Sequence, residues 1–312
     1  MEKTLQNFGK QCESAQTLGR GIRVSAQRVL IAGVGGSAFA GDVLRTVAQE
    51  ADVYVHRDYG LPRLGKDALV FAVSYSGNTE ETLSALQQAI QEKRPVVGIS
   101  SGGKLEELCL AHHTDHIKIP AGVQPRNALG YLIIPMLNVL EENGIVGKQE
   151  LGGLRKELED PAIRKEGKRI AALLEGKTPL IYSSERMACL SYGWKTRVNE
   201  NAKVHAFAHR VPELNHNELV GYTKKIGNFY TLMIRDREDS TRVRKRFDAT
   251  KKMIEELGGE CCIVDTRGSG LLSRVFNTLH IGDWASYELA LRYGVDPEPV
   301  HVIERFKKEL GS

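Results

Sequence analysis

Short apolar runs alternate along the chain with longer segments in which apolar residues recur every three or four positions. Runs of the first kind are typical of buried strands, and segments of the second kind are typical of amphipathic helices. After a polar N-terminal helix, the first half of the chain follows this alternation throughout. It predicts strands at residues 29–34, 53–56, 68–73, 96–100 and 116–119, and helices at residues 39–50, 80–92, 104–111 and 128–142.

The second half repeats the alternation. The pair Asn143-Gly144 is a helix-stop signal, and a charged helical stretch follows it. Repeated strand–helix units indicate a parallel sheet with helices on both faces. We therefore expect an α/β fold with two doubly wound three-layer (αβα) domains, residues 1–146 and residues 147–312. The second domain has predicted strands at 179–182, 203–208, 229–235 and 260–265, and predicted helices at 187–200, 240–257, 271–293 and 299–310.

Two loops, each between a predicted strand and a predicted helix, carry serine, threonine and glycine. The first is Gly33-Val34-Gly35-Gly36-Ser37-Ala38, and the second is Ser74-Tyr75-Ser76-Gly77-Asn78-Thr79-Glu80-Glu81. Such loops offer hydroxyls, backbone N–H groups and a helix N-terminus to one anion. Because neither loop contains a basic residue, we interpret them as a cradle that holds a phosphate group without cleaving it. The residues expected to hold the phosphate are Gly36, Ser37, Ser74, Ser76 and Thr79.

Two other interpretations of these loops stay open. Thr79 would also serve as the cap of a helix without any ligand. The first loop also fits the relaxed dinucleotide fingerprint G-x-G-x-x-[G/A], with Asp58 as the ribose-binding acid. However, Asp58 comes later than that motif prefers, and the fingerprint gives no role to Ser37. Two such loops at the carboxyl ends of strands favour ligand binding, because ligands of open α/β sheets bind there.

Composition narrows the class of protein. The formal net charge of +4 is small for 312 residues and does not by itself indicate a nucleic-acid partner. Five cysteines form no C-x-x-C pair, which favours reduced thiols inside a cell. No apolar h-region follows residues 1–10, and the longest apolar stretch, residues 128–140, is too short to span a bilayer. We expect a cytoplasmic protein with no membrane or nucleic-acid partner.

The two loops and three further motifs resemble a known family. Gly-Gly-Ser followed by Ser-Tyr-Ser-Gly-Asn-Thr-Glu-Glu-Thr resembles the sugar isomerase (SIS) domain, which binds phosphosugars. Three further strings are similar to the bifunctional phosphoglucose/phosphomannose isomerases of archaea and some bacteria: Gln124-Pro125-Arg126, Asn199-Glu200-Asn201 and Pro212-Glu213-Leu214-Asn215-His216-Asn217-Glu218. The resemblance spans nearly the whole chain. It implies two SIS-type subdomains and an isomerase that interconverts glucose 6-phosphate, and mannose 6-phosphate as well, with fructose 6-phosphate through a cis-enediol.

The resemblance also implies roles for four residues. Glu200 is the base that carries a proton between C1 and C2, and Arg126 places a guanidinium beside the enediolate. His216 opens the sugar ring, and in the resembling superfamily the matching histidine comes from the neighbouring subunit of a homodimer. Lys307, or the adjacent Lys308, assists at the sugar ring. The route requires no metal and no redox cofactor. From the residues alone, a structural role for each of these side chains stays open.

Three rival functions stay open as well. A SIS module that senses a sugar phosphate without turning it over would not require Glu200 and His216 together. An NAD-dependent dehydrogenase would bind nicotinamide and change the absorbance of the reduced cofactor. Another aldose–ketose phosphate isomerase, or an amino-sugar enzyme, would use the same phosphate cradle.

Overall fold

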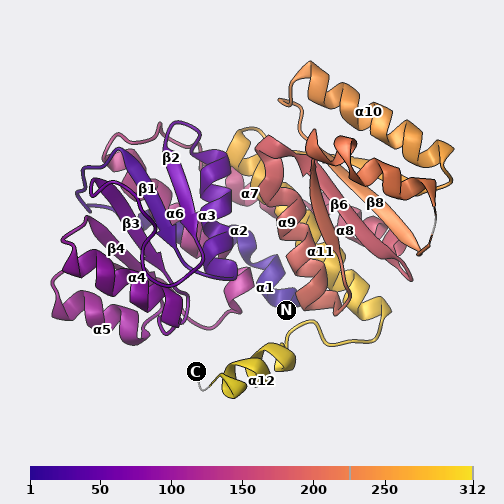
Figure 1. Cartoon of the computed structure of the whole chain (residues 1–312). Coiled ribbons are helices and arrows are strands. Elements are labelled where there is room, and N and C mark those ends of the chain that lie inside the picture. The colour runs from indigo at the N-terminus through magenta and orange to yellow at the C-terminus, as the bar shows by residue number, and fades with distance from the viewer. Residues whose placement is uncertain (225, 311–312) are drawn as a thin grey trace. The chain divides into compact units, whose positions relative to one another are not determined.

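The chain forms two compact units in the computed structural model, which describes residues 1–224 and 226–310 (Figure 1). The N-terminal unit contains Gln6–Glu159 with Gly270–Ser273, and the C-terminal unit contains Met1–Leu5, Asp160–Ser269 and Arg274–Ser312. The sequence predicts a domain boundary between residues 146 and 147, and this boundary stays a prediction.

The N-terminal unit is built on a five-stranded parallel sheet with the order β2-β1-β3-β4-β5. Every residue of the central strand β3 is buried, which explains its unbroken apolar sequence. The order of the strands reverses direction between β1 and β3, and such a switch point is where doubly wound sheets bind ligands. The strands are β1 (Arg28–Ala32), β2 (Asp52–His56), β3 (Ala68–Val73), β4 (Val96–Ser100) and β5 (Asp115–Lys118).

Helices cover both faces of this sheet (Figure 1). α4 and α5 pack against one face, where Leu86 and Leu105 share an apolar cluster with Val70. On the other face, α3 lies so close that a Cβ added to Gly41 would come within 3.0 Å of the side chain of Ile31. The elements are α2 (Phe8–Ser14), η1 (Ala15–Thr17), α3 (Gly36–Val47), α4 (Glu80–Gln91), α5 (Gly103–Ala111), η2 (Pro125–Asn127), α6 (Leu129–Glu142) and α7 (Leu154–Leu158).

The C-terminal unit contains a four-stranded parallel sheet with the order β7-β6-β8-β9. Its switch point lies between β6 and β8, so the topology repeats that of the first sheet. β7 is an edge strand, and only its last residue is buried. The strands are β6 (Thr178–Ser184), β7 (Phe207–Val211), β8 (Phe229–Arg235) and β9 (Glu260–Asp265).

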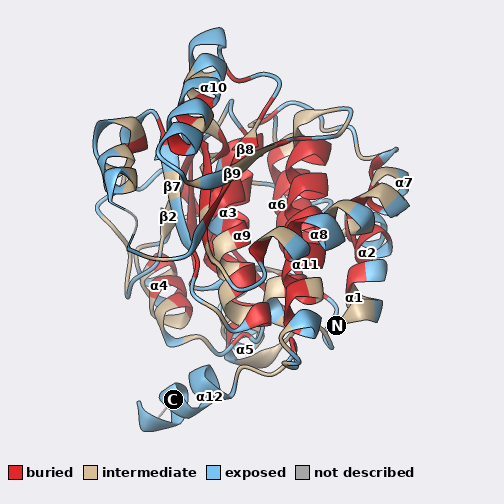
Figure 2. Cartoon of the chain, turned by 90° about the vertical axis from the view of Figure 1, so that its right-hand side faces the viewer, coloured by how far each residue is buried: buried red, intermediate tan, exposed pale blue. Residues whose placement is uncertain are grey.

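Helices also cover this second sheet on both faces (Figures 1 and 2). α10 and the turns η5 and η6 lie over one face, where Tyr182, Leu214 and Phe247 share an apolar cluster. On the other face, the indole of Trp194 in α9 donates to the carbonyl of Thr278 in α11 at 2.8 Å. The elements are α1 (Glu2–Gln6), α8 (Pro161–Leu174), η3 (Glu185–Met187), α9 (Ala188–Arg197), η4 (Val198–Ala202), η5 (Glu213–His216), η6 (Glu218–Thr223), α10 (Thr241–Glu256), α11 (Leu271–Arg292) and α12 (His301–Glu309).

The predicted fold class, two parallel sheets flanked by helices, is confirmed, and one strand is displaced from its predicted position. β7 spans Phe207–Val211, whereas the sequence predicts residues 203–208. Lys203 has a φ of 60° and ends the π-helical turn η4, so residues 203–206 form the connection into the strand.

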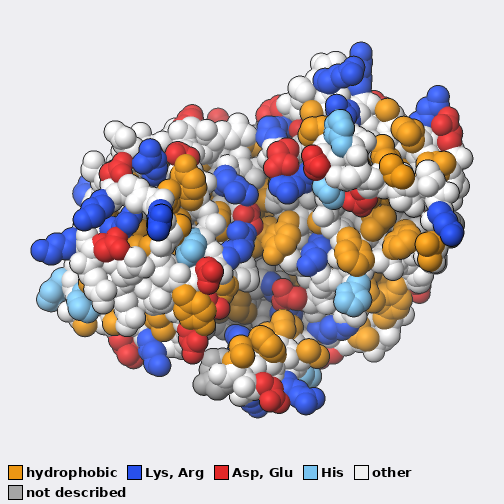
Figure 3. Space-filling view, viewed as in Figure 1, with side chains coloured by type: hydrophobic (Ala, Val, Ile, Leu, Met, Phe, Trp, Pro, Cys, Tyr) orange, Lys and Arg blue, Asp and Glu red, His pale blue; other side chains and the backbone are white. Residues whose placement is uncertain are grey.

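Three observations concern membrane-spanning helices, metal ligands and surface charge. Within residues 1–224 and 226–310, no helix combines the length and the apolar character needed to cross a bilayer. Over the same described residues, no three His, Cys, Asp or Glu side chains are grouped as metal ligands. On the face drawn in Figure 3, basic and acidic side chains are interspersed on each unit.

Candidate active site

The two loops rich in serine, threonine and glycine, here called the hydroxyl loops (residues 33–38 and 74–81), start side by side at the carboxyl edge of the first sheet. The N–H of Gly33, just after β1, donates to the carbonyl of His56 at the end of β2 at 3.1 Å. A Cβ added to Gly33 would lie 2.7 Å from the carbonyl oxygen of Val73, the last residue of β3. Glycine at position 33 therefore lets the first hydroxyl loop leave β1 in close contact with the start of the second.

Three hydroxyl groups fix the shape of these loops. Ser37 Oγ accepts a hydrogen bond from the N–H of Tyr75 at 3.3 Å, which ties the first loop to the second. Ser74 Oγ lies 2.9 Å from Thr79 Oγ1 and accepts from the N–H of Gly77 at 3.1 Å. Ser37 and Ser74 are both buried. The structure thus brings Ser37, Ser74 and Thr79 together at the switch point.

The helices that follow the hydroxyl loops begin without a side-chain cap. α3 begins after Gly35, which has no side chain to cap it, and α4 begins after Thr79, whose side chain makes no hydrogen bond to the backbone of α4. Thr79 points to Ser74 instead. Because the first N–H groups of a helix lack intrahelical partners and carry partial positive charge, an anion is stabilised at such an end. This geometry favours the anion-binding interpretation of Thr79 over the capping one.

Ser76 lies at the exposed tip of the second loop, and Gly77 fixes that tip against the neighbouring strand end. Ser76 Oγ accepts from the N–H of Asn78 at 3.3 Å. Gly77 has a φ of 73°, and a Cβ there would lie 1.7 Å from the carbonyl oxygen of Gly102. The carbonyl of Gly77 also accepts from the N–H of Leu105 at 2.9 Å. Only glycine fits position 77, both sterically and in backbone conformation.

Gly36 brings a third segment to the same place. A Cβ added to Gly36 would lie 3.1 Å from the carbonyl oxygen of Pro125 and 3.3 Å from the backbone nitrogen of Arg126. The start of α3 therefore packs directly on η2, the turn that carries Arg126. This places the backbone of Arg126 at the first hydroxyl loop.

Tyr75 also ties the second hydroxyl loop to the segment before Arg126. Its hydroxyl accepts from the N–H of Val123 at 3.1 Å and donates to the carbonyl of Pro120 at 3.1 Å. Burial raises the pKa of Tyr75, so the hydroxyl stays a neutral donor and acceptor. Sequence analysis assigned no role to Tyr75. The sequence signal that could have indicated a role for Tyr75 is its position between Ser74 and Ser76.

Glu200 lies in the C-terminal unit, on the π-helical turn η4 that continues α9. The turn is held on both sides, because the amide of Asn201 donates to Ser286 Oγ at 2.9 Å and that of Asn199 donates to the carbonyl of Val204 at 2.8 Å. Lys203 Nζ donates to the carbonyls of Glu200 and Pro299, both at 2.6 Å. Glu200 itself is partly exposed. Single π-helical turns of this kind occur frequently at functional sites.

His216 ends η5, the turn after β7. Its neighbours are fixed: Leu214 is fully buried, and the amide of Asn215 donates to Thr250 Oγ1 at 2.8 Å. The His216 side chain is exposed. The backbone of the turn is therefore anchored against α10 while the imidazole faces solvent.

β7 separates Glu200 from His216. Glu200 comes before the amino end of β7, because α9 runs back along β6 from its carboxyl end, and His216 comes after the carboxyl end of β7. A strand of five residues spans about 16 Å at roughly 3.3 Å per residue. The structure of one chain therefore places the two predicted catalytic groups at opposite ends of β7.

Lys307 and Lys308 lie on α12, on which every residue is exposed. The hydrogen bond from Lys203 to Pro299 anchors the segment that leads into this helix beside the turn of Glu200. The choice between the two lysines stays a prediction.

Comparison with known proteins identifies the family. Residues 24–128 match the SIS domain, and residues 163–310 match the "Bacterial phospho-glucose isomerase C-terminal SIS domain". A "Bifunctional phosphoglucose/phosphomannose isomerase" from Thermoplasma volcanium is 39% identical over 288 residues, which cover 91% of this chain and 91% of that protein. A protein of the same name from Caldicellulosiruptor bescii is 36% identical and covers 100% of this chain and 99% of its own. The chain belongs to the bifunctional phosphoglucose/phosphomannose isomerase family.

A solved structure supports the fold at lower sequence identity. Glucosamine-6-phosphate deaminase from Thermotoga maritima superposes with a TM-score of 0.70 at 16% identity, covering 95% of this chain and 96% of that one. At this identity the likeness concerns the fold alone. The SIS fold and the family that the sequence indicates are thus confirmed, whereas the roles of single residues stay predictions.

The second switch point of this isomerase-family chain holds a buried charged group, here called the Asp236 network (Ser184, Arg186, Asp236, Asp239, Thr266 and Arg274). Asp236 accepts from Thr266 Oγ1 at 2.5 Å and from Arg274 Nε at 2.8 Å, and it also pairs with Arg186. Asp239 accepts from Ser184 Oγ at 2.7 Å. The side chains of Asp236 and Arg274 are almost completely buried. Sequence analysis missed this network.

The network also sets the charge of Asp236. Burial raises its pKa, but hydrogen bonds from Thr266, the N–H of Glu238 and Arg274 outweigh burial, so its pKa lies below the ordinary value for an aspartate. The carboxylate is therefore ionised and saturated with donors from its own chain. The second switch point thus holds a carboxylate paired with guanidinium groups, whereas the hydroxyls at the first are hydrogen-bonded to one another and to backbone N–H groups beside helix ends that have no side-chain cap.

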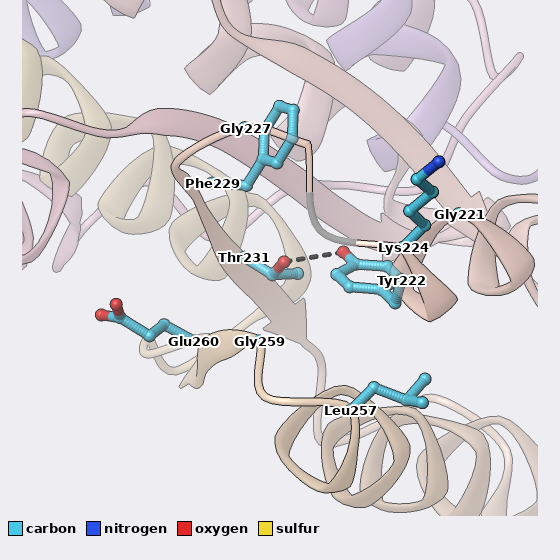
Figure 4. Close-up of a pocket in the computed structure, with 9 residues that line it drawn as sticks. All are labelled: Gly221, Tyr222, Lys224, Gly227, Phe229, Thr231, Leu257, Gly259 and Glu260. Carbon is cyan, nitrogen blue, oxygen red and sulfur yellow. Dashed lines mark hydrogen bonds between the residues drawn. The ribbon is translucent and has the colours of Figure 1, made fainter.

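A pocket of the C-terminal unit lies away from all predicted site residues (Figure 4). Tyr222 and Thr231 are hydrogen-bonded across it at 2.7 Å between their side-chain oxygens. Because none of the residues predicted for phosphate binding or catalysis lines it, this pocket does not belong to the candidate active site. It is lined by Gly221, Tyr222, Lys224, Gly227, Phe229, Thr231, Leu257, Gly259 and Glu260.

Proposed function

We propose that this chain interconverts glucose 6-phosphate and mannose 6-phosphate with fructose 6-phosphate through a cis-enediol. The single observation that carries the proposal is the convergence of Ser37, Ser74 and Thr79 beside two uncapped helix N-termini at the β1/β3 switch point, in a chain of the bifunctional isomerase family. Neutral hydroxyl and N–H donors bind a phosphate dianion without activating it for cleavage. Gly36 and Ser76 complete the proposed set.

The proposed chemistry divides into three tasks. Glu200 takes a proton from C1 or C2 and returns it to the other carbon. Arg126, whose backbone lies at the first hydroxyl loop, supplies the cation that stabilises the enediolate. Lys307 assists at the sugar ring. The fixed turn η4 supports this assignment for Glu200, because a base that moves a proton between adjacent carbons needs a constant position.

We further propose that His216 acts on a sugar ring bound by the neighbouring subunit of a homodimer. Its exposed imidazole lies at the other end of β7 from Glu200, so the two groups of one chain are too far apart to contact one substrate together. A histidine of the partner removes that difficulty. The imidazole would donate to the ring oxygen and accept from the anomeric hydroxyl.

The cytoplasm is the compartment we propose for this protein. Burial raises the pKa of the thiols of Cys12 and Cys109, which keeps them protonated and unreactive inside the N-terminal unit. Buried thiols of this kind fit a reducing compartment.

Assays of the purified protein on both hexose phosphates test the function. Fructose 6-phosphate should form from glucose 6-phosphate and from mannose 6-phosphate, and the Glu200→Gln variant should lose at least about a hundredfold in kcat because proton transfer has no base. Glu256→Gln, on the exposed face of α10, serves as the matched control. Tight binding of both hexose phosphates without turnover would indicate that the chain is a sugar-phosphate sensor and not an isomerase.

Mixing two inactive variants tests the shared site. In an equimolar mixture of Glu200→Gln and His216→Asn chains, about half the dimers are mixed, and each mixed dimer has one site with both groups intact. About one quarter of wild-type activity should therefore return. No recovery, with mixed dimers demonstrated by mass spectrometry, would mean that His216 acts within its own chain.

A further inference from the structure

Lys203 joins two segments that carry proposed site residues. Its ammonium donates to the carbonyl of Glu200, three residues earlier on the turn η4, at 2.6 Å. It also donates at 2.6 Å to the carbonyl of Pro299, which lies 96 residues further along the chain, just before α12. Hydrogen bonds from a charged donor are shorter and stronger than those between neutral groups. One side chain therefore links the turn of the proposed base to the helix of the proposed lysine.

The turn η4 is the fixed side of this link. Arg197, three residues before Glu200, forms a buried ion pair with Asp283 of α11. The amide of Asn201, one residue after Glu200, donates to the buried hydroxyl of Ser286, also on α11, at 2.9 Å. A shift of η4 would break these buried polar contacts, and breaking such contacts is costly. The position of Glu200 along the chain is therefore set by α11.

The helix α12 is the exposed side of the link. Each of its nine residues is exposed, and its N-cap residue, Val300, offers no side-chain hydrogen bond to its first turn. The segment before the helix is also held at Glu298, which pairs with the amino group of Met1. A short helix without a buried face has little stability of its own. Contacts at its start, such as that of Lys203 with Pro299, therefore decide where α12 lies.

We infer that Lys203 is a positioning residue, which ties α12 to η4 and so holds the proposed lysine of α12 at a constant distance from Glu200. The inference rests on the proposed function, because it takes Glu200 as the base and a lysine of α12 as the group that assists at the sugar ring. An ammonium has three donors, so it bonds two carbonyls at once. Lys203 acts through these two segments and does not touch the substrate. Misplacement of a catalytic group by about 1 Å costs up to about a hundredfold in rate, which gives such a tie a catalytic consequence.

Steady-state kinetics on glucose 6-phosphate test the role of the ammonium. Lys203→Met keeps an apolar stem but has no donor, so kcat should fall about tenfold. KM should change less than about twofold, because the proposed phosphate donors belong to the N-terminal unit. Lys203→Arg keeps the charge and the donors and should recover most of the lost kcat. An unchanged kcat in Lys203→Met, or a loss that Lys203→Arg shares in full, would overturn the inference.

Two further variants separate the ammonium from the backbone of Lys203. Lys203→Asn suits the left-handed backbone, with its φ of 60°, but is too short to reach both carbonyls, so it should lose as much kcat as Lys203→Met. Lys93→Met is the matched control, because Lys93 is also exposed and also left-handed after a helix, with a φ of 53°. It should keep the kcat of the unsubstituted protein. Equal losses at positions 93 and 203 would overturn the inference.

Trypsin digestion measures the tie without reference to activity. The exposed helix α12 offers trypsin three basic residues, Arg305, Lys307 and Lys308. Release of C-terminal peptides, followed by mass spectrometry, should be several-fold faster in Lys203→Met than in the unsubstituted protein, and unchanged in Lys93→Met. Equal rates of release in all three proteins would contradict the tie.

A variant without the two lysines of α12 tests whether Lys203 acts through that helix. In the background of Lys307→Met with Lys308→Met, the further change Lys203→Met should lower kcat little, because the group that it positions is already gone. Losses that multiply would overturn the inference, since residues that act independently have additive free energies.

The digestion also keeps this inference separate from the proposed function. Faster cleavage in Lys203→Met, with neither hexose phosphate converted by the unsubstituted protein, would end the proposed function and leave the tie as a structural contact only. Normal conversion by the unsubstituted protein, with kcat and cleavage both unchanged in Lys203→Met, would leave the function standing and overturn the inference.

Discussion

The two sheets of this chain share a topology but use their switch points in opposite ways. At β1/β3, hydroxyls and N–H groups surround two helix ends that have no side-chain cap. At β6/β8, Arg186 and Arg274 pair with Asp236 in a buried ionic network, and Ser240 caps α10 by accepting from the N–H of Val243 at 3.3 Å. The second switch point thus contains an anion of its own, whereas at the first we propose that the anion is the phosphate group of a substrate.

This difference shows that the topology of a doubly wound sheet creates a switch point, but the residues at that point decide whether it can bind a ligand. Both sites have a helix that begins just after the central strands. In the second sheet, the carboxylate of Asp236 lies just after the carboxyl end of β8 and pairs with the guanidinium groups of Arg186 and Arg274. We expect this network to stabilise the fold at the second switch point, whereas the role that we propose for the first switch point is substrate binding.

The largest effect is expected from breaking the Asp236 network. Asp236→Ala leaves the buried guanidinium of Arg274 without its main partner, which should lower the free energy of unfolding by about 3–5 kcal/mol. Asp265→Ala, at the end of the neighbouring strand β9, is the control, because that carboxylate is largely exposed and should matter little. Urea denaturation of both variants checks the contrast. Equal stability of the two would show that the network is not structural.

A smaller loss is expected from substitution of Gly77 in the second hydroxyl loop. Gly77→Ala should cost about 2–4 kcal/mol, because the backbone has positive φ and the new Cβ would collide with the carbonyl of Gly102. Gly144→Ala is matched in φ, at 67°, but meets nothing within 4 Å, so it should cost only about 1 kcal/mol. Gly77→Ala should also raise KM, because Gly77 lies in the second hydroxyl loop. Similar melting temperatures for Gly77→Ala and Gly144→Ala would show that the collision with the carbonyl of Gly102 does not cause the loss of stability.

Substitutions in the hydroxyl loops and at the N-cap of α10 should separate effects on substrate binding from effects on stability. Ser74→Ala removes a proposed phosphate donor and should raise KM about tenfold, which corresponds to roughly 1.4 kcal/mol. Ser240→Ala removes a helix cap and should cost about 1 kcal/mol of stability with KM unchanged. Steady-state kinetics and thermal unfolding of both variants check the separation. An unchanged KM in Ser74→Ala would indicate that Ser74 has a structural role at the first switch point and does not bind the phosphate.

The smallest effect is a change in the pH dependence of stability. Because the folded state lowers the pKa of Asp236, its contribution is fully present above the unfolded value of about 3.9 and is lost as pH falls through the folded value. The stability difference between wild type and Asp236→Asn should therefore be constant above about pH 5 and shrink at lower pH, by less than about 1.4 kcal/mol per pH unit. A constant difference down to pH 2 would contradict this.

The buried parts of the fold could be predicted from the sequence. β3, β4 and β8 are mostly buried and match their predicted bounds because each is a largely apolar run. β9 also matches, although Val264 is its only buried residue. β7 was misplaced because an edge strand with only Val211 buried carries little apolar signal, and the positive φ of Lys203 leaves no mark in the composition.

The candidate site could be predicted only in part. The loop residues Ser37, Ser74 and Thr79 stand beside strand ends in the sequence, so their convergence follows from the topology of a parallel sheet. The Asp236 network could not be foreseen, because it joins residues from three distant segments whose pairing depends on tertiary contacts. The functions of Glu200 and His216 came from resemblance, since neither residue has a local signal of its own.

Tyr75 joins the second hydroxyl loop to the segment before Arg126 through two hydrogen bonds of its single hydroxyl group. Under the proposed function, the Tyr75 hydroxyl therefore links the loop that binds the ester group to the segment that leads to the guanidinium proposed to stabilise the enediolate. Neutral hexoses, which offer no charge to the loop, would lose rate as well as affinity. Discrimination between phosphorylated and free sugars would then depend on this phenol as well as on the donors of the hydroxyl loops.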